Sequence, residues 1–144
     1  MAKRNILRVF EGFAGYGGAS FGLKKAKIPH RVIGYSDIEQ EAIDLYEYNF
    51  PNIKNYGDIT QIDPKELPDF DLFTGGFPCQ PFSTAGMQKG ESDPYGRGTL
   101  FYEFARLVQE IEPKAFIYEN VQGLVTHDNG KTWQVVQRVF NSLG

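Results

Sequence analysis

The sequence has a single cysteine, no excess of basic residues and no long hydrophobic run. One cysteine, Cys79, cannot form an internal disulfide or a cysteine-rich zinc site. The formal net charge of −3 argues against a strongly basic nucleic-acid binder, although only for the whole-chain average. No apolar run approaches the ~20 residues that span a bilayer, and the start of the chain lacks the apolar core of a signal peptide. We therefore expect a reducing, cytoplasmic setting and no membrane partner.

The composition is typical of one globular domain. The 144 residues suit a single domain over 1–144, and a domain of this size buries roughly 70% of the surface that its unfolded chain exposes. Hydrophobic residues make up 41% and charged residues 23%, which excludes wholesale disorder. Aromatic residues reach 15%, and many of the 16 glycines stand in two short clusters. Those two clusters indicate tight turns or loops at these places in the chain.

Apolar runs alternate with amphipathic stretches along the chain. The runs at 6–10, 31–36, 53–56, 70–74 and 115–119 predict strands, the one at 53–56 weakly. Helices are predicted over 19–27, 38–50, 99–110 and 130–143. Residues 80–98 are predicted to form a long loop, and such loops in compact domains are usually functional or disordered. This rhythm indicates βαβ units and a parallel sheet with right-handed crossovers. Ligands bind such sheets at the carboxyl ends of the strands.

Two features at the first strand ends favour a nucleotide ligand. The glycine turn of Gly15, Gly17 and Gly18 opens a helix, whose free N–H groups attract polar ligand groups. Asp37 follows the second strand, at a spacing suited to binding ribose hydroxyls. Each alone has a plain alternative, a tight strand–helix turn or a helix N-cap, but the pair favours a nucleotide. Asp58 follows the third run, and its carboxylate could accept a hydrogen bond from an adenine amino group. A structural role as a turn aspartate explains it equally well.

Two reactive side chains follow the last strands. Cys79 comes after Gly75, Gly76 and Pro78, at a stiff position that suits a nucleophile better than the buried core site usual for a lone cysteine. Glu119 leaves an apolar strand and is expensive to bury, so we expect it to face a cleft, although an ordinary solvent carboxylate is the alternative. Together they would form a thiol–carboxyl pair beside a nucleotide site.

These motifs resemble those of the bacterial DNA (cytosine-5)-methyltransferases, over the family's amino-terminal half. The turn FAGYGG resembles the family's S-adenosylmethionine loop, and GGFPCQPFS resembles its nucleophile motif, the most specific match. RGTLF at 97–101, ENV at 119–121 and HDNG at 127–130 follow in the family's order. The chain departs from the family at Glu11, where Asp is usual, and at Asp37, where Glu is frequent. The family's arginine-bearing motif, target-recognition region and closing segment are absent.

The resemblance implies an α/β, Rossmann-like S-adenosylmethionine-dependent methyltransferase fold, with helices on both faces of a parallel sheet and incomplete at the C-terminus. It implies methyl transfer from S-adenosylmethionine to C5 of cytosine in double-stranded DNA, in a restriction-modification context, leaving S-adenosylhomocysteine and using no metal. Cys79 would add to C6 of a flipped-out base, while Glu119 acts near N3. The implied cofactor contacts are Phe13, Ala14, Gly15, Gly17, Asp37, Ile38, Asp58, Ile59, Pro78 and Leu100. The implied DNA contacts are Gln80, Ser83, Gln88, Lys89 and Arg97.

Three alternatives to an active DNA enzyme stay open at this point. The chain could be a non-catalytic fragment, or one subunit of a split methyltransferase that needs a second polypeptide. An RNA cytosine-5 methyltransferase would carry the same motifs. A nicotinamide-dependent dehydrogenase is disfavoured because the glycine spacing is wrong for it and Cys79 would be unexplained.

Overall fold

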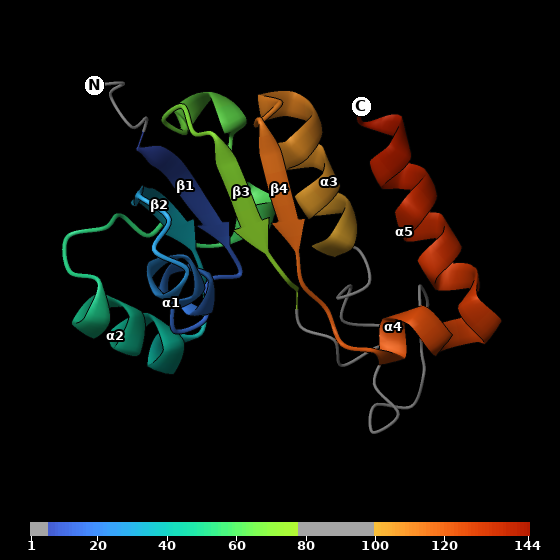
Figure 1. Ribbon diagram of the computed structural model, residues 1–144, viewed down its shortest axis with the longest axis horizontal. Helices are drawn as coiled ribbons and strands as arrows, with labels where there is room; N and C mark the ends of the chain where they lie inside the picture. Colours follow the sequence, from blue (N-terminus) through green and yellow to red (C-terminus); the bar gives the residue numbers. More distant parts are fainter. Residues whose placement is uncertain (1–5, 78–99) are drawn as a thin grey trace.

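The protein folds around a parallel sheet, as seen in a computed structural model that describes residues 6–77 and 100–144 (Figure 1). Within those residues the sheet has four strands in the order β2-β1-β3-β4, all of them parallel. The strands are β1 (Leu7–Gly12), β2 (His30–Ser36), β3 (Leu72–Gly75) and β4 (Ala115–Tyr118). The parallel sheet predicted from the strand–helix rhythm is thereby confirmed.

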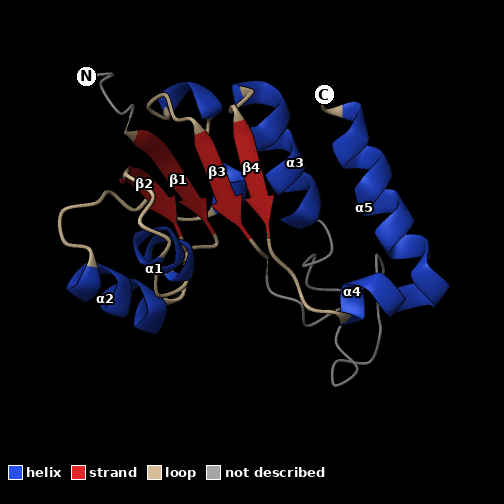
Figure 2. Ribbon diagram, viewed as in Figure 1, coloured by secondary structure: helices blue, strands red, loops and turns tan. Residues whose placement is uncertain are grey.

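Helices cover both faces of this sheet (Figure 2). Helix α1 (Gly18–Lys25) packs Leu23 against Val9 and Leu72 on one face. Helix α3 (Leu100–Ile111) packs Phe104 and Leu107 against Phe10 and Phe73 on the opposite face. Neighbouring strand residues point to opposite faces, which explains why consecutive apolar residues are buried in different layers.

The remaining helices complete the layers. Helix α2 (Gln40–Asn49) buries Tyr46 against Tyr35 of β2, with their rings stacked at 3.9 Å between centroids. Helix α5 (Lys131–Ser142) packs Phe140 on the α3 side, after the short α4 (Gly123–Thr126) and the 3₁₀ turn η5 (His127–Gly130). The stacked pair Phe73–Phe104, 4.4 Å apart, belongs to this core. Many of the aromatic residues therefore serve packing.

The structure corrects two local expectations. Residues 53–56 form no strand; Asn55 makes one isolated parallel bridge to Tyr35 at the outer edge of β2. Polar and glycine residues follow at once, and the chain turns into the 3₁₀ helices η1 (Ile59–Gln61) and η2 (Pro64–Glu66). Helix α2 starts at Gln40 rather than at 38, so its N-cap is Glu39 and not Asp37.

A carboxylate at the amino end of β3 joins three strands. Asp71 accepts hydrogen bonds from the backbone N, Nε and Nη2 of Arg8. Lys114 Nζ lies 2.8 Å from Asp71 Oδ1. These contacts hold the amino ends of β1, β3 and β4 together, at the end of the strands opposite the site. Within residues 6–77 and 100–144 no helix is both long enough and apolar enough to cross a membrane.

Candidate functional site

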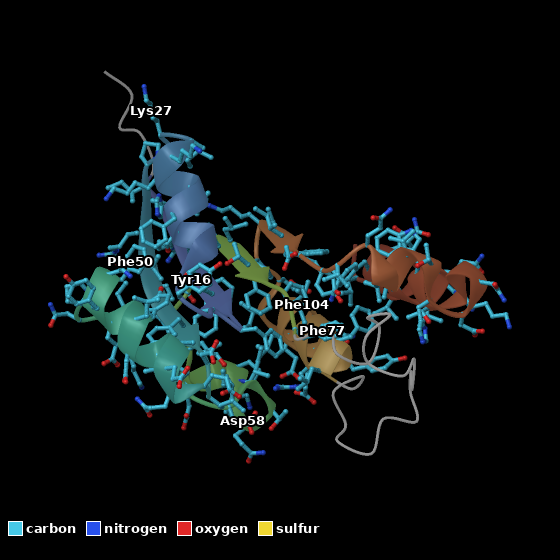
Figure 3. All side chains as sticks on the ribbon, turned by 90° about the horizontal axis from the view of Figure 1, so that it is seen from below. Tyr16, Lys27, Phe50, Asp58, Phe77 and Phe104 are labelled. Atoms are coloured by element: carbon cyan, nitrogen blue, oxygen red, sulfur yellow. The ribbon has the colours of Figure 1, made fainter. Side chains whose placement is uncertain are left out.

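Two adjoining pockets open where the strands end. The strand-end pocket, of about 570 Å³, is lined by Glu11, Gly12, Tyr16, Thr74, Ile117 and Glu119 among others. The Asp37 pocket, of about 280 Å³, is lined by Ser36, Asp37, Ile38, Asp58, Ile59 and Leu100 among others. Phe13, Gly15 and Gly76 line both pockets, so the two are contiguous. Figure 3 views the molecule from this end, with Tyr16, Asp58 and Phe77 labelled around it.

The glycine turn between β1 and α1 separates the two pockets. Its backbone is left-handed at Phe13 (φ 50°), Gly15 (φ 56°) and Gly17 (φ 89°), a region that glycine enters without strain. The amide of Ala14 donates to the carbonyl of Ser36 at 3.1 Å, which fastens the turn to the end of β2. The turn therefore presents its backbone to both pockets. Phe13, Ala14 and Gly15 line at least one pocket each, as expected of residues near a ligand.

Gly17 is the last left-handed residue of the turn, and it lines neither pocket. It is buried, and an added Cβ would fall against Phe50 and 3.3 Å from the ring of Tyr46. Only glycine fits there, because the site is both left-handed and closely packed. Its contact with the cofactor stays a prediction.

Asp37 ties the turn to the start of α2. Its Oδ2 accepts from the backbone N of Gly15 at 2.7 Å, and its Oδ1 accepts from the backbone N of Glu39 at 2.9 Å. The half-buried carboxylate also lines the Asp37 pocket. A carboxylate offers about four lone-pair sites, so these two bonds leave capacity for a ligand hydroxyl. Its ribose contact stays a prediction that this position permits.

The side chain of Asn55 hydrogen-bonds two residues that line the Asp37 pocket, Asp37 and Gly57. Its Oδ1 accepts from the backbone N of Gly57 at 2.9 Å and of Asp37 at 3.2 Å, while its Nδ2 donates to the carbonyl of Asp37 at 3.1 Å. Ser36 adds a hydroxyl bond of 2.6 Å to the carbonyl of Gly57. These bonds hold residues 55–58 alongside the end of β2.

The other walls of the Asp37 pocket are mostly apolar. Ile38 is 67% exposed at the rim, Ile59 is buried, and Leu100 is half-buried at the start of α3. Asp58 is exposed, and its Oδ1 accepts from the backbone N and the hydroxyl of Thr60. Asp58 thus acts as a turn aspartate, one of the two roles expected for it. Its contact with adenine stays a prediction.

Glu119 and Gly76 meet in the strand-end pocket. The backbone N of Glu119 donates to the carbonyl of Gly75 at 2.9 Å, which continues the pairing of β3 with β4. A Cβ on Gly76 would lie 2.8 Å from Glu119 Oε2 and would press against the Glu119 carbonyl. The carboxylate is exposed and lines the pocket. The expectation that Glu119 faces a cleft agrees with this placement, while its catalytic role stays a prediction.

A second carboxylate, Glu11, is buried at the end of β1. It is 1% exposed, and it accepts from the backbone N of Ser20 at 2.8 Å and from the hydroxyl of Tyr46. Burial and the neighbouring Glu11 charge raise the pKa of Tyr46, so the phenol stays a donor. Thr74 of β3 pairs with Glu11 of β1. Its hydroxyl is buried and has no hydrogen-bond partner among the described residues.

Seven predicted site residues lie outside the described residues. They are the catalytic Cys79, the cofactor contact Pro78, and the DNA contacts Gln80, Ser83, Gln88, Lys89 and Arg97. Among residues 6–77 and 100–144, no group of three or more His, Cys, Asp and Glu is placed to hold a metal ion. The absence of a metal requirement stays a prediction.

Three residues that line or support the site were not among the predicted site residues. Gly76 had a usable signal, since a Gly-Gly pair directly after a strand indicates a close approach of backbone. Asn55 and Tyr46 had none, because their partners stand 18 and 35 positions away in the chain. Contacts of that range become visible only once the strands are placed.

Comparison with known proteins gives one consistent result. The family described as C-5 cytosine-specific DNA methylase matches residues 7–144. The orphan methyltransferase M.SPRI of Bacillus phage SPR is 40% identical over 140 residues, covering 96% of this chain and 31% of that protein. The type II methyltransferase M.HhaI of Haemophilus parahaemolyticus is 42% identical over 137 residues, covering 95% of this chain and 40% of that protein. The chain thus spans well under half the length of these curated relatives.

Solved structures agree on the fold. The crystal structure of S. pombe Dnmt2 methyltransferase superposes with a TM-score of 0.70 at 26% identity, over 93% of this chain and 40% of that one. A Spodoptera frugiperda DNMT2 mutant gives a TM-score of 0.68 at 22% identity, which speaks to the fold alone. Together with the parallel sheet, these likenesses bear out the Rossmann-like methyltransferase fold expected from the sequence.

Proposed function

The chain belongs to the C-5 cytosine-specific DNA methylase family, and from that membership we propose that it carries the cofactor and catalytic part of a DNA cytosine-5 methyltransferase. The substrate is cytosine in double-stranded DNA, and the methyl donor is S-adenosylmethionine. One observation carries the proposal: two contiguous pockets, one beside Asp37 and one beside Glu119, flank the glycine turn at the carboxyl ends of the strands.

The residues present fit S-adenosylmethionine. The Asp37 pocket offers a carboxylate for ribose hydroxyls and the apolar walls Ile38, Ile59 and Leu100 for a purine. The strand-end pocket offers the backbone of the glycine turn for the methionine part, and its buried Thr74 hydroxyl has no partner among residues 6–77 and 100–144. Because the pockets adjoin at Gly15 and Gly76, an elongated ligand can occupy both.

The chemistry divides between two side chains. When bound, S-adenosylmethionine supplies the methyl group that cytosine C5 takes up. The Cys79 thiolate adds to C6 and gives C5 enamine character. Glu119 assists that addition at N3 by hydrogen bonding or protonation. Transfer of the C5 proton to a base then expels the Cys79 thiolate and restores the aromatic ring of the cytosine.

Access to the base requires the DNA contacts predicted for residues 80–97. A cytosine inside a duplex must leave the stack before its C6 can be attacked. Gln80, Ser83 and Gln88 carry groups able to hydrogen-bond near the vacated position, and Lys89 and Arg97 carry charges suited to phosphates. Their role rests on the resemblance of the sequence motifs.

A methyl-transfer assay tests the proposal. Purified chain is incubated with labelled S-adenosylmethionine and either cytosine-containing duplex DNA or RNA, with and without a candidate partner chain. We expect label on DNA cytosine C5. Label on RNA alone would overturn the DNA assignment, and transfer only when the partner is added would identify a split enzyme. No transfer in any arm would contradict a catalytic role.

A further inference from the structure

We propose that Tyr46 is a positioning residue that, through Glu11, fixes the glycine turn and so sets the affinity of the strand-end pocket for the amino-acid end of its ligand. This rests on the proposed function, because it takes the ligand to be S-adenosylmethionine or its product. Tyr46 lines neither pocket, so it acts only through the residues that it holds.

The first step is the buried hydrogen-bond chain. Tyr46 is 0% exposed, and its hydroxyl donates to one oxygen of Glu11, which is 1% exposed. The other oxygen of Glu11 accepts from the backbone N of Ser20 at 2.8 Å. A buried carboxylate needs such donors, since an unpaired buried charge is strongly unfavourable. Residues from α2, β1 and α1 are therefore joined at one point.

The second step is the cap of α1. The N-cap residue of this helix is Gly17, which has no side chain and makes no capping bond. Helix starts leave backbone N–H groups without intrahelical partners. Glu11 supplies the missing acceptor through Ser20 and brings a negative charge to the positive end of the helix dipole. The position of the first turn of α1 thus depends on where Glu11 is held.

The third step is the packing of the tyrosine ring. Tyr35 stacks on it at 3.9 Å, and Phe50 lies 5.2 Å from it, measured between ring centroids. The space that a Cβ of Gly17 would need is bounded by the rings of Phe50 and Tyr46. The ring thus packs beside Gly17 of the glycine turn, while its hydroxyl holds Glu11, in β1 just before the turn.

The consequence differs between the two pockets. Glu11, Tyr16 and Gly18 line only the strand-end pocket, and neither Glu11 nor Tyr46 lines the Asp37 pocket. Removal of the Tyr46 hydroxyl should therefore weaken the binding of S-adenosylhomocysteine, which reaches the strand-end pocket, more than the binding of adenosine, which needs the Asp37 pocket alone.

Isothermal titration calorimetry on the 144-residue chain tests this with both ligands. For Tyr46→Phe we expect at least about a fivefold loss of affinity for S-adenosylhomocysteine, the scale of one typical net hydrogen bond. Adenosine affinity should change less than about twofold. The matched control is Tyr48→Phe, which makes the same change on the same helix at a ring that is 84% exposed, and both affinities should stay at their wild-type values.

A second variant keeps the test decisive if Tyr46→Phe folds poorly by circular dichroism. Glu11→Gln retains the side-chain shape and should produce the same selective loss, and the double variant should lose little more than either single one. Equal losses for both ligands, or wild-type affinity in both single variants, would overturn the inference. If the unaltered chain binds neither ligand, the proposed function itself fails, a result distinct from the other two.

Discussion

The carboxylate of Asp37 accepts a hydrogen bond of 2.7 Å from the backbone amide of Gly15, 22 positions earlier in the chain. Gly15 borders both pockets, so this bond links the residue proposed to bind ribose with the turn proposed to bind the methionine part. The family often has Glu, one methylene longer, at this place.

Replacement of Asp37 by Ala should weaken S-adenosylhomocysteine binding at least tenfold. The expected loss corresponds to a hydrogen bond to a charged group, ~1.5–3 kcal/mol, because both the ligand contact and the Gly15 contact disappear. Calorimetric titration measures it. Asp44→Ala, at an exposed position of α2, is the matched control, and equal affinities of the two variants would count against the ribose assignment.

Replacement of Cys79 by Ser should abolish covalent trapping on duplex DNA that contains 5-fluorocytosine. Fluorine at C5 cannot leave as a proton does, so the thiolate adduct persists and migrates as a larger species on a denaturing gel. Trapping should be seen with the unaltered enzyme, together with any partner that activity requires, and not with ordinary cytosine. Persistent trapping by the serine variant would exclude Cys79 as the nucleophile.

Replacement of Gly76 by Ala should destabilise the chain and displace Glu119. The added Cβ would lie 2.8 Å from Glu119 Oε2 and against its carbonyl oxygen, and overpacking of this kind costs ~1–3 kcal/mol. Urea unfolding followed by circular dichroism measures the loss. Gly22→Ala is the control, since nothing lies within 4 Å of its Cβ and a helical Gly-to-Ala change stabilises by ~0.5–1 kcal/mol. Equal stabilities would refute the close approach.

Replacement of Asp71 by Asn should destabilise the chain at neutral pH, by an amount that falls in acid. The side-chain hydrogen bonds from Arg8 and then from Lys114 hold the pKa of Asp71 well below its ordinary value. A carboxyl with a lowered folded-state pKa stabilises the fold above its unfolded pKa, near 3.9, and loses that contribution as the pH falls toward the folded value. Urea midpoints at pH 7 and pH 3.5 should therefore differ more between wild type and variant at pH 7. A gap independent of pH would contradict this.

The sequence allowed most of the sheet to be predicted, and the reasons are local. The runs at 6–10, 31–36, 70–74 and 115–119 became β1 to β4 within a few residues of their predicted limits. The run at 53–56 failed as a strand because only Asn55 pairs there.

Site residues could be predicted where they belong to a short sequence motif. They could not be predicted where their role depends on partners far away in the chain. The glycine turn and Asp37 line adjoining pockets, while the nucleotide contacts that their spacing indicated stay predictions. Tyr46 looked like one more apolar position of a helix, since nothing near it in the chain indicates Glu11 as its partner. Asn55 was likewise hidden inside a weak strand pattern, because its bonds to Asp37 exist only in the folded chain.

The boundary between the two pockets consists of Phe13, Gly15 and Gly76, and two of these three residues have no side chain. The separation of the pockets is accordingly a dimension of the main chain, fixed by the end of β3 and by one turn after β1. Substitutions at Ile38 or Leu100 can reshape the Asp37 pocket without touching this boundary. The backbone at this boundary therefore bears on the length of ligand that the two pockets accept, whereas the side chains of the pocket walls bear on its width.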